Sequence, residues 1–318
     1  MMLVSVLIVT IGAKDYIQPC LDSLLEQTHL PFEIMVMDNS SQPDFARQLN
    51  SLYPSVKIYS SAGNLFYTGA LNKGIQLAQG EFILCLNDDV ILDKRFIEEA
   101  LRGFQLDNKI GLVNGKILRG DRKTMDTAGL SLSFFRAAQE RGYGLKDSGQ
   151  FEKAGFIFGV NGAAAFYRKD MLDRIKINSE YFDCDYRFFY EDLDISWRAK
   201  RFGWKAYYNP KSIAYHVRGG SVRNRSGLNK PYARRYLNDE LQADLVKNRF
   251  LTIIKNESLF GFLLRFPFIA FYDLAALLYI IFFSPRVIKI LFFNLKYIKG
   301  AFRKRKILAQ MELSEKVA

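Results

Sequence analysis

Short apolar runs alternate with segments of helical periodicity in the first part of the chain, and this alternation constrains the fold more than any other feature of the sequence. The apolar runs have the β-branched composition of buried strands, and they cover residues 4–10, 32–37, 56–59 and 82–86. Helical spacing of apolar side chains marks the segments between them, residues 16–27, 45–52 and 69–79. Strand–helix alternation at this spacing predicts an α/β fold with a mostly parallel sheet and crossover helices.

Polar side chains stand where three of these strands end. Thr10 closes the first strand, Asp38 and Asn39 follow the second, and Asp88 and Asp89 follow the fourth. Ligands of parallel α/β sheets bind outside the carboxyl ends of the strands, so we expect these side chains to meet at one crevice. Adjacent carboxylates are costly without a cation, and their oxygens suit Mg²⁺ or Mn²⁺. A turn that merely favours Asn and Asp is the alternative.

A second acidic cluster lies in the aromatic-rich segment 181–198. Asp194 and Arg198 are spaced i, i+4, which favours an ion pair on a helix. Glu191 lies three residues before Asp194, whereas Asp192 projects from a different side of the helix and is free for another role. An acidic first turn that complements the helix dipole is the alternative interpretation.

Two further features carry weaker signals. His216 follows an apolar run and precedes residues 219–221, Gly-Gly-Ser, and both a structural histidine and a metal ligand fit this position. The segment from Asn64 to Asn72 has the pattern of a loop that enters a helix, where Gly69 permits close backbone approach. Backbone N–H groups at such a helix start could meet a phosphate.

Taken together, these motifs resemble family 2 glycosyltransferases of the GT-A fold, and the resemblance covers roughly residues 1–255. The pattern is most similar to the bacterial branch that contains rhamnosyltransferases of cell-surface polysaccharide synthesis. The matching segments occur in the family's order: residues 4–10, 37–40, 64–74, 86–89, 162–168, 182–198 and 216–221. The resemblance implies a nucleotide-sugar-binding half in residues 1–110 and an acceptor and catalytic half in residues 111–255.

The resemblance implies roles for residues on the donor side. Asp38 matches the acid that reads the nucleotide base, with Thr10 and Asn39 beside it. Asp88 would reach the donor sugar or ribose. Glu191 is also expected to bind substrate. A nucleotide-sugar donor is therefore the expected ligand of the first half of the chain.

The donor loop departs from the family's pattern. Asn64 and Asn72 match a motif that usually reads Asn-x-Gly-Phe-x-Gly, but Phe66 and Tyr67 replace Gly-Phe here. The contacts to the donor sugar are therefore expected to differ. Two donor classes stay open: dTDP-L-rhamnose, and a UDP-hexose or UDP-N-acetylhexosamine.

Metal and catalytic roles follow from the same resemblance. Asp89 matches the last acid of the family's Asp-x-Asp motif, whose first acid is Asn87 here, and His216 matches a second metal ligand of some members. Asp192 matches the catalytic base of inverting members. Mg²⁺ or Mn²⁺ would neutralise the leaving diphosphate, and the base would take the proton of the acceptor hydroxyl. We expect an inverting glycosyltransferase, with a non-catalytic sugar-nucleotide-binding membrane scaffold as the alternative outside enzymes.

The charge of the chain is concentrated in its tail. The formal net charge is +12, of which the segment from Leu259 to the end carries +7 and the first 258 residues +5. An apolar segment, residues 287–298, continues into Arg-Lys-Arg-Lys at 303–306, and one helical face collects the basic side chains of Lys289, Lys296, Lys299 and Arg303. This pattern predicts an interfacial helix on an anionic membrane, not a nucleic-acid-binding element.

The tail, residues 256–318, leaves alternatives open. Residues 274–283 form the longest clean apolar stretch, shorter than the roughly 20 residues that a membrane span needs. A spanning or re-entrant hairpin, a subunit interface in a homo-oligomer, and a helix packed on the catalytic domain are the other interpretations. With a lipid-linked glycan as the expected acceptor, the sequence predicts a peripheral or monotopic protein on the cytoplasmic face of the plasma membrane.

Overall fold

The computed structural model describes residues 2–30, 32–61, 63–218 and 237–317. Its centre is a mixed ten-stranded sheet with the path β10-β12-β6-β11-β4-β1-β2-β3. The first four parallel strands are β1 (Val4–Thr10), β2 (Phe32–Asp38), β3 (Lys57–Ser60) and β4 (Phe82–Asn87). The parallel sheet predicted for the first part of the chain is therefore confirmed.

The remaining strands extend this sheet and add a small hairpin. β11 (Ala164–Arg168) runs antiparallel between β4 and β6 (Ile110–Arg119), and β12 (Lys205–His216) lies parallel to β6. Short strands complete the edges: β5 (Val90–Leu92), β7 (Met125–Thr127) and β10 (Gly155–Ile157). The separate hairpin consists of β8 (Leu130–Leu132) and β9 (Ala138–Glu140).

A register shift between β6 and β12 brings the end of β12 beside β5, near the carboxyl end of β4. The shift falls at Asn209/Ile213, where the backbones approach so closely that a Cβ at Gly115 would collide with the Ser212 carbonyl oxygen. Beyond the shift, His216 pairs with Val90 of β5. His216 therefore lies beside the end of β4, far from it in sequence.

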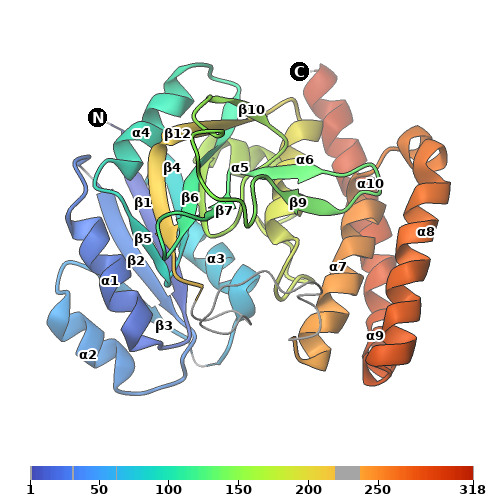
Figure 1. The fold of residues 1–318 in the computed structure, drawn as a ribbon, viewed down its shortest axis with the longest axis horizontal. Helices are drawn as coiled ribbons and strands as arrows, with labels where there is room; N and C mark the ends of the chain where they lie inside the picture. Colours follow the sequence, from blue (N-terminus) through green and yellow to red (C-terminus); the bar gives the residue numbers. More distant parts are fainter. Residues whose placement is uncertain (1, 31, 62, 219–236, 318) are drawn as a thin grey trace.

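Helices cover both faces of the sheet (Figure 1). One apolar core lies under α1 (Lys14–Leu25), α2 (Phe45–Leu52) and α4 (Phe96–Gln105). The other lies under α3 (Phe66–Leu77), α5 (Lys169–Ile175) and α6 (Glu191–Arg201). Both faces of the central strands are buried, as their continuous apolar runs predict.

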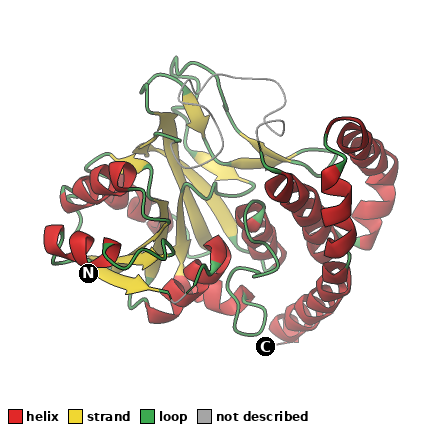
Figure 2. Cartoon of the chain, turned by 90° about the horizontal axis from the view of Figure 1, so that it is seen from below, coloured by secondary structure: helices red, strands yellow, loops and turns green. Residues whose placement is uncertain are grey.

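Four helices follow the sheet and gather at one side of it (Figure 2). They are α7 (Asp239–Asn256), α8 (Leu259–Phe283), α9 (Arg286–Asn294) and α10 (Lys296–Val317). Side-chain caps begin two of them, since Asn238 accepts from Leu241 N and Ser258 accepts from Gly261 N. α10 returns to the sheet, where Leu308 is buried in the core under α3, α5 and α6.

The tail differs from the prediction in two ways. The expected helix across residues 287–303 is divided at Leu295, between α9 and α10. The basic run at 303–306 is partly turned inward: Lys304 is 8% exposed and pairs with Asp183 and Asp185, and Arg305 donates to the Ile254 and Glu257 carbonyls. Sequence periodicity could not show this, because the acids that capture Lys304 lie 119 or more residues away.

α8 is longer than the clean apolar stretch indicated. Its 25 residues run through Arg265, Pro267 and Asp273. Two of these residues have hydrogen-bond partners, since Arg265 donates to the Gly261 carbonyl and Asp273 accepts from Arg249 of α7. Among the described residues, α8 is the one helix long and apolar enough to cross a membrane, by length and composition.

Candidate active site

The polar strand ends meet as the parallel topology predicts. Thr10 pairs in register with Asp38, and its hydroxyl donates to Asp88 Oδ2 over 2.7 Å. Asn39 N donates to the Thr10 carbonyl over 2.9 Å. Burial raises the pKa of Asp88 to about 6, although the Thr10 hydrogen bond opposes that shift.

A cavity of about 150 Å³ opens at these strand ends. Asn39 and Asn64 line it together with Phe66, Asp88 and Asp89. Asn64 Oδ1 accepts from Phe66 N over 2.7 Å, and Asn39 Nδ2 donates to the Phe66 carbonyl over 3.1 Å. These contacts hold Phe66 at a φ of 55°, in the left-handed region, where the loop enters α3. We call this the strand-end cavity.

Asp38 and Asn72 are absent from the lining of this cavity. Asp38 is buried behind it, where Ser40 N and the Ser60 hydroxyl donate to its two carboxylate oxygens over 2.8 and 3.0 Å. Asn72 is buried in α3, and its side-chain amide bonds both the N–H and the carbonyl of Phe182 over 2.8 and 2.7 Å. In the structure the Asn72 amide ties α3 to the segment before α6, and the substrate-binding role expected for Asn72 stays a prediction.

His216 lies between two carboxylates. Its Nε2 is 3.1 Å from Asp89 Oδ1, and its Nδ1 is 2.8 Å from Asp126 Oδ2. Asp126 is fully buried in β7 and also accepts from Arg218. Burial disfavours the charged ring, but the two neighbouring carboxylates raise the pKa of His216 to about 9. The sequence did not single out Asp126, because nothing in its local pattern marks a partner 90 residues away.

The pair of Asp89 and His216 fits a divalent cation held jointly with a substrate. His216 Nε2 is buried without a well-directed hydrogen bond, while Asp126 holds the opposite ring nitrogen, as the carboxylate partners of metal-bound histidines do. No group of three or more His, Cys, Asp or Glu side chains within the described ranges is arranged to hold a metal. Mg²⁺ commonly needs only one or two protein ligands when substrate phosphates supply the rest.

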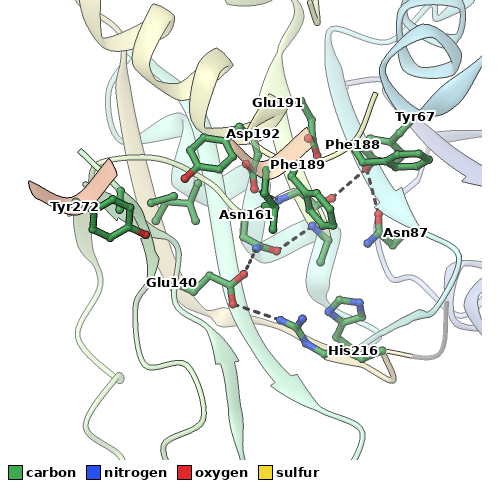
Figure 3. Close-up of a pocket in the computed structure, with 18 residues that line it drawn as sticks. Tyr67, Asn87, Glu140, Asn161, Phe188, Phe189, Glu191, Asp192, His216 and Tyr272 are labelled. Carbon is green, nitrogen blue, oxygen red and sulfur yellow. Dashed lines mark hydrogen bonds and ion pairs between the residues drawn. The ribbon is translucent and has the colours of Figure 1, made fainter. Parts of the chain in front are cut away.

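A larger cavity of about 410 Å³ adjoins the strand-end cavity, and we call it the central cavity (Figure 3). The two cavities share Tyr67, Asn87 and Phe188 in their walls. Tyr67 fixes this shared wall, because its hydroxyl donates to Asn87 Oδ1 over 3.1 Å and to the Gly162 carbonyl over 3.3 Å. His216 lines the central cavity as well, so both cavities border the expected metal position.

Glu191 and Asp192 enter the central cavity from the first turn of α6. Asp192 accepts from Gly162 N over 3.0 Å and from Leu193 N over 2.7 Å. Burial raises the pKa of both carboxyls, and the charge of Asp192 raises that of Glu191 further. The pKa of Glu191 rises to about 8, so Glu191 is largely protonated at neutral pH, whereas two backbone N–H groups favour the charged form of Asp192. The predicted ion pair between Asp194 and Arg198 is confirmed at 3.0 Å.

Several residues of the central cavity were missed from sequence. Asn161 donates to Glu140 of β9 over 3.3 Å, and Tyr272 of α8 closes the far side (Figure 3). Phe189 and Tyr190 precede the acidic pair with φ of 67° and 70°. The aromatic run directly before Glu191 was the available signal, but nothing in it indicated a left-handed turn. Residues 219–221 of the His216 motif lie outside the described residues.

Comparison with known families and proteins agrees with this geometry. The model of "Glycosyl transferase family 2" matches residues 5–176. The chain is 21% identical over 226 residues to a poly-beta-1,6-N-acetyl-D-glucosamine synthase of Staphylococcus epidermidis, covering 67% of this chain and 49% of that protein. It is 32% identical over 114 residues to a chondroitin synthase of Pasteurella multocida, covering 35% of this chain and 12% of that protein.

Solved structures with the same fold include two glycosyltransferases. A mannosyltransferase of Pyrobaculum calidifontis in complex with GDP-Man and Mn²⁺ superposes with a TM-score of 0.55 at 15% identity, over 98% of this chain and 86% of that one. GalNAc-T7 with UDP, GalNAc and Mn²⁺ superposes with a TM-score of 0.59 at 12% identity, over 80% of this chain and 48% of that one. At these identities the likeness is one of fold.

Proposed function

The chain belongs to glycosyl transferase family 2, and from that premise we propose that it transfers a sugar from a nucleotide-sugar donor to a hydroxyl of a lipid-linked glycan, with inversion at the anomeric carbon. One observation carries the proposal: two cavities share a wall, with Asp89 and His216 at their junction and Asp192 inside the larger one. This arrangement suits a single displacement. The acceptor hydroxyl attacks the anomeric carbon from one side, and the leaving group departs from the opposite side.

The donor nucleotide is assigned to the strand-end cavity. Asn39, Asn64 and Asp88 present amide and carboxyl groups there, and Thr10 orients Asp88. Asp38 supports the loop that follows β2, because its carboxylate accepts from Ser40 N. Its role in reading the nucleotide base is part of the proposal. Asp89 and His216 would hold Mg²⁺ or Mn²⁺, which supplies charge neutralisation for the leaving diphosphate.

Asp192 is proposed as the general base. Its carboxyl group lines the cavity that would receive the acceptor, and two backbone N–H groups fix its orientation and favour its charged form. It would accept the proton of the acceptor hydroxyl as that oxygen attacks the anomeric carbon. Glu191 keeps a proton and so presents a hydrogen-bond donor to the bound sugar from the same helix turn.

The division into parts follows the same logic. We assign residues 1–110 to the donor half, 111–255 to the acceptor and catalytic half, and 256–318 to membrane association on the cytoplasmic face. α8 exposes large apolar side chains, and Tyr272 on the same helix lines the central cavity. A lipid-linked acceptor is supported by this position, because a helix in contact with lipid would then border the cavity for the acceptor glycan.

The donor sugar is the finer part of the proposal. We keep two donor classes, dTDP-L-rhamnose and a UDP-hexose or UDP-N-acetylhexosamine. Phe66 and Tyr67 line the strand-end cavity, so the donor loop is where the two classes would be distinguished. A thermal-shift screen of nucleotide sugars with and without Mn²⁺ separates these classes, and a product assay with the best binder tests turnover. Binding without turnover would favour a non-catalytic sugar-nucleotide-binding scaffold.

A further inference from the structure

A second large cavity lies among the C-terminal helices, on the opposite side of α7 from the acidic pair. Its volume is about 440 Å³, within the range of roughly 300–1,000 Å³ typical of small-molecule sites. Its walls are hydrocarbon side chains of α7, α8 and α9, among them Val246, Phe250, Leu277, Ile280 and Leu291. We call it the tail cavity.

Its polar lining is limited to two described residues, Lys247 and Asn294. The ammonium of Lys247 is engaged, since it donates to the Asp185 carbonyl over 2.7 Å and pairs with Asp244 over 2.9 Å. Asn294 Nδ2, in contrast, is buried with no hydrogen-bond partner. A buried donor of this kind is costly unless a ligand oxygen reaches it. The tail cavity thus combines an apolar interior with one unused amide donor.

The outer faces of the same helices are apolar as well. α8 exposes Phe271 at 70% and Phe282 at 74%, and α9 exposes Phe293 at 63%. Exposed cations lie directly beside the lining in the chain, since Lys289, Lys296 and Lys299 each follow a residue that lines the tail cavity, namely Ile288, Leu295 and Ile298. An apolar surface edged by cations suits the boundary between acyl chains and anionic headgroups.

We propose that the tail cavity binds one acyl chain of an anionic bilayer phospholipid, and so anchors the protein to the membrane through an individual lipid as well as through its surface. The chain would fill the apolar interior, Asn294 would donate to an ester oxygen, and the exposed lysines would meet the phosphate. This inference rests on the proposed membrane association of residues 256–318.

Geometry favours a bilayer lipid over the lipid of the acceptor. Leu245 of α7 lines the central cavity, whereas Val246 and Phe250 line the tail cavity, so the helix separates the two. On α8, Tyr272 lines the central cavity and Leu277 the tail cavity. An acyl chain seated in the tail cavity would therefore be separated from Asp192 by α7 and α8.

The test uses the full chain bound to phosphatidylglycerol vesicles that carry a photoactivatable group in the acyl chain. After irradiation and digestion, the labelled peptides are mapped by mass spectrometry. We expect labels on the side chains that line the tail cavity, such as Val246, Phe250, Leu277, Ile280 and Leu291. Vesicle flotation, measured on the same samples, reports membrane association separately.

Leu277→Trp fills the cavity, and Leu274→Trp is its matched control on the exposed face of the same helix. Each methylene excluded from an apolar site costs about fourfold in affinity, so an indole that displaces two lowers cavity labelling about fifteenfold. Ile281→Trp, at a half-exposed position of the lining, gives a second filling variant if Leu277→Trp fails to fold. Leu274→Trp is expected to label like the wild type.

Two results would overturn the inference. The first is labelling confined to outward positions, such as Phe271 and Phe282, or equal labelling of the two filling variants and the control. Either outcome would contradict the lipid site and leave membrane association intact. Absence of flotation in the wild type would contradict membrane association itself and the lipid site with it.

Discussion

Asn248 of α7 controls the shape of the turn that leads into the acidic pair. It is fully buried, and its Nδ2 donates to the Phe188 carbonyl over 2.6 Å and to the Phe189 carbonyl over 2.9 Å. Phe189 and Tyr190 both have positive φ, a conformation that costs on the order of 1–3 kcal/mol for each non-glycine residue. The turn therefore persists only because its surroundings hold it in place.

Asn248→Leu removes both hydrogen bonds at nearly constant volume. A typical hydrogen bond contributes about 1 kcal/mol net, so the change removes about 2 kcal/mol that opposes the strain of the turn. If the productive arrangement of Phe188, Glu191 and Asp192 becomes about 2 kcal/mol less stable, the activation free energy rises by the same amount and kcat falls about 30-fold. We expect this loss while the variant stays folded, since the strain is released as the hydrogen bonds are lost.

The matched control is Gln242→Leu on the same helix. Gln242 is also buried and donates to the Leu237 carbonyl over 2.8 Å, but it does not touch the turn. Steady-state kinetics and urea unfolding are measured for both variants. A kcat for Asn248→Leu equal to that of Gln242→Leu would refute the idea that Asn248 positions the catalytic turn.

Further predictions concern pH, metal and the docking of α10. Because burial raises the pKa of Asp192, kcat is expected to rise with pH through a value above the ordinary aspartate range of about 4, and a pH–rate profile measures it. Glu191→Gln should retain most of kcat, since Glu191 is already protonated. EDTA should stop turnover, Mn²⁺ or Mg²⁺ should restore it, and Asp126→Asn should raise the metal concentration needed about 10–100-fold in a titration of activity. Lys304→Ala should lower the free energy of unfolding in urea at pH 7 by less than the roughly 3–5 kcal/mol of a fully unpaired buried charge, because Asp183 keeps its pairing with Lys255. The lysines hold the pKa of Asp183 below its ordinary value despite burial, so this pairing stabilises the fold above pH 4 and is lost as the pH falls further.

The sequence predicted the features that depend on local periodicity. Buried strands with polar ends were recognisable because β-branched runs alternate with helical segments, and the parallel topology then brings Thr10, Asp38 and Asp88 together. The ion pair of Asp194 and Arg198 was predictable for the same reason, since helical spacing alone defines it.

The features that sequence could not predict depend on contacts between distant segments. α7 has the composition of a mixed-charge surface helix, yet it buries Asn248, Thr252 and Lys255. Lys255 is buried because it pairs with Asp183 and Asp194, which lie at and before the start of α6. No periodic pattern marks these buried positions, because the partners of Asn248 and Lys255 before α6 and in its first turn lie 59 or more residues away.

The central claim is that Asp192 takes the proton from the acceptor hydroxyl. Asp192→Asn keeps the shape of the side chain and removes its basicity, so the measurement is single-turnover product formation with donor binding followed in parallel by thermal shift. We expect product formation to fall about 10²–10⁴-fold, the usual contribution of a general base, while the donor binds as in the wild type. Product formation at the wild-type rate would contradict the assignment of Asp192.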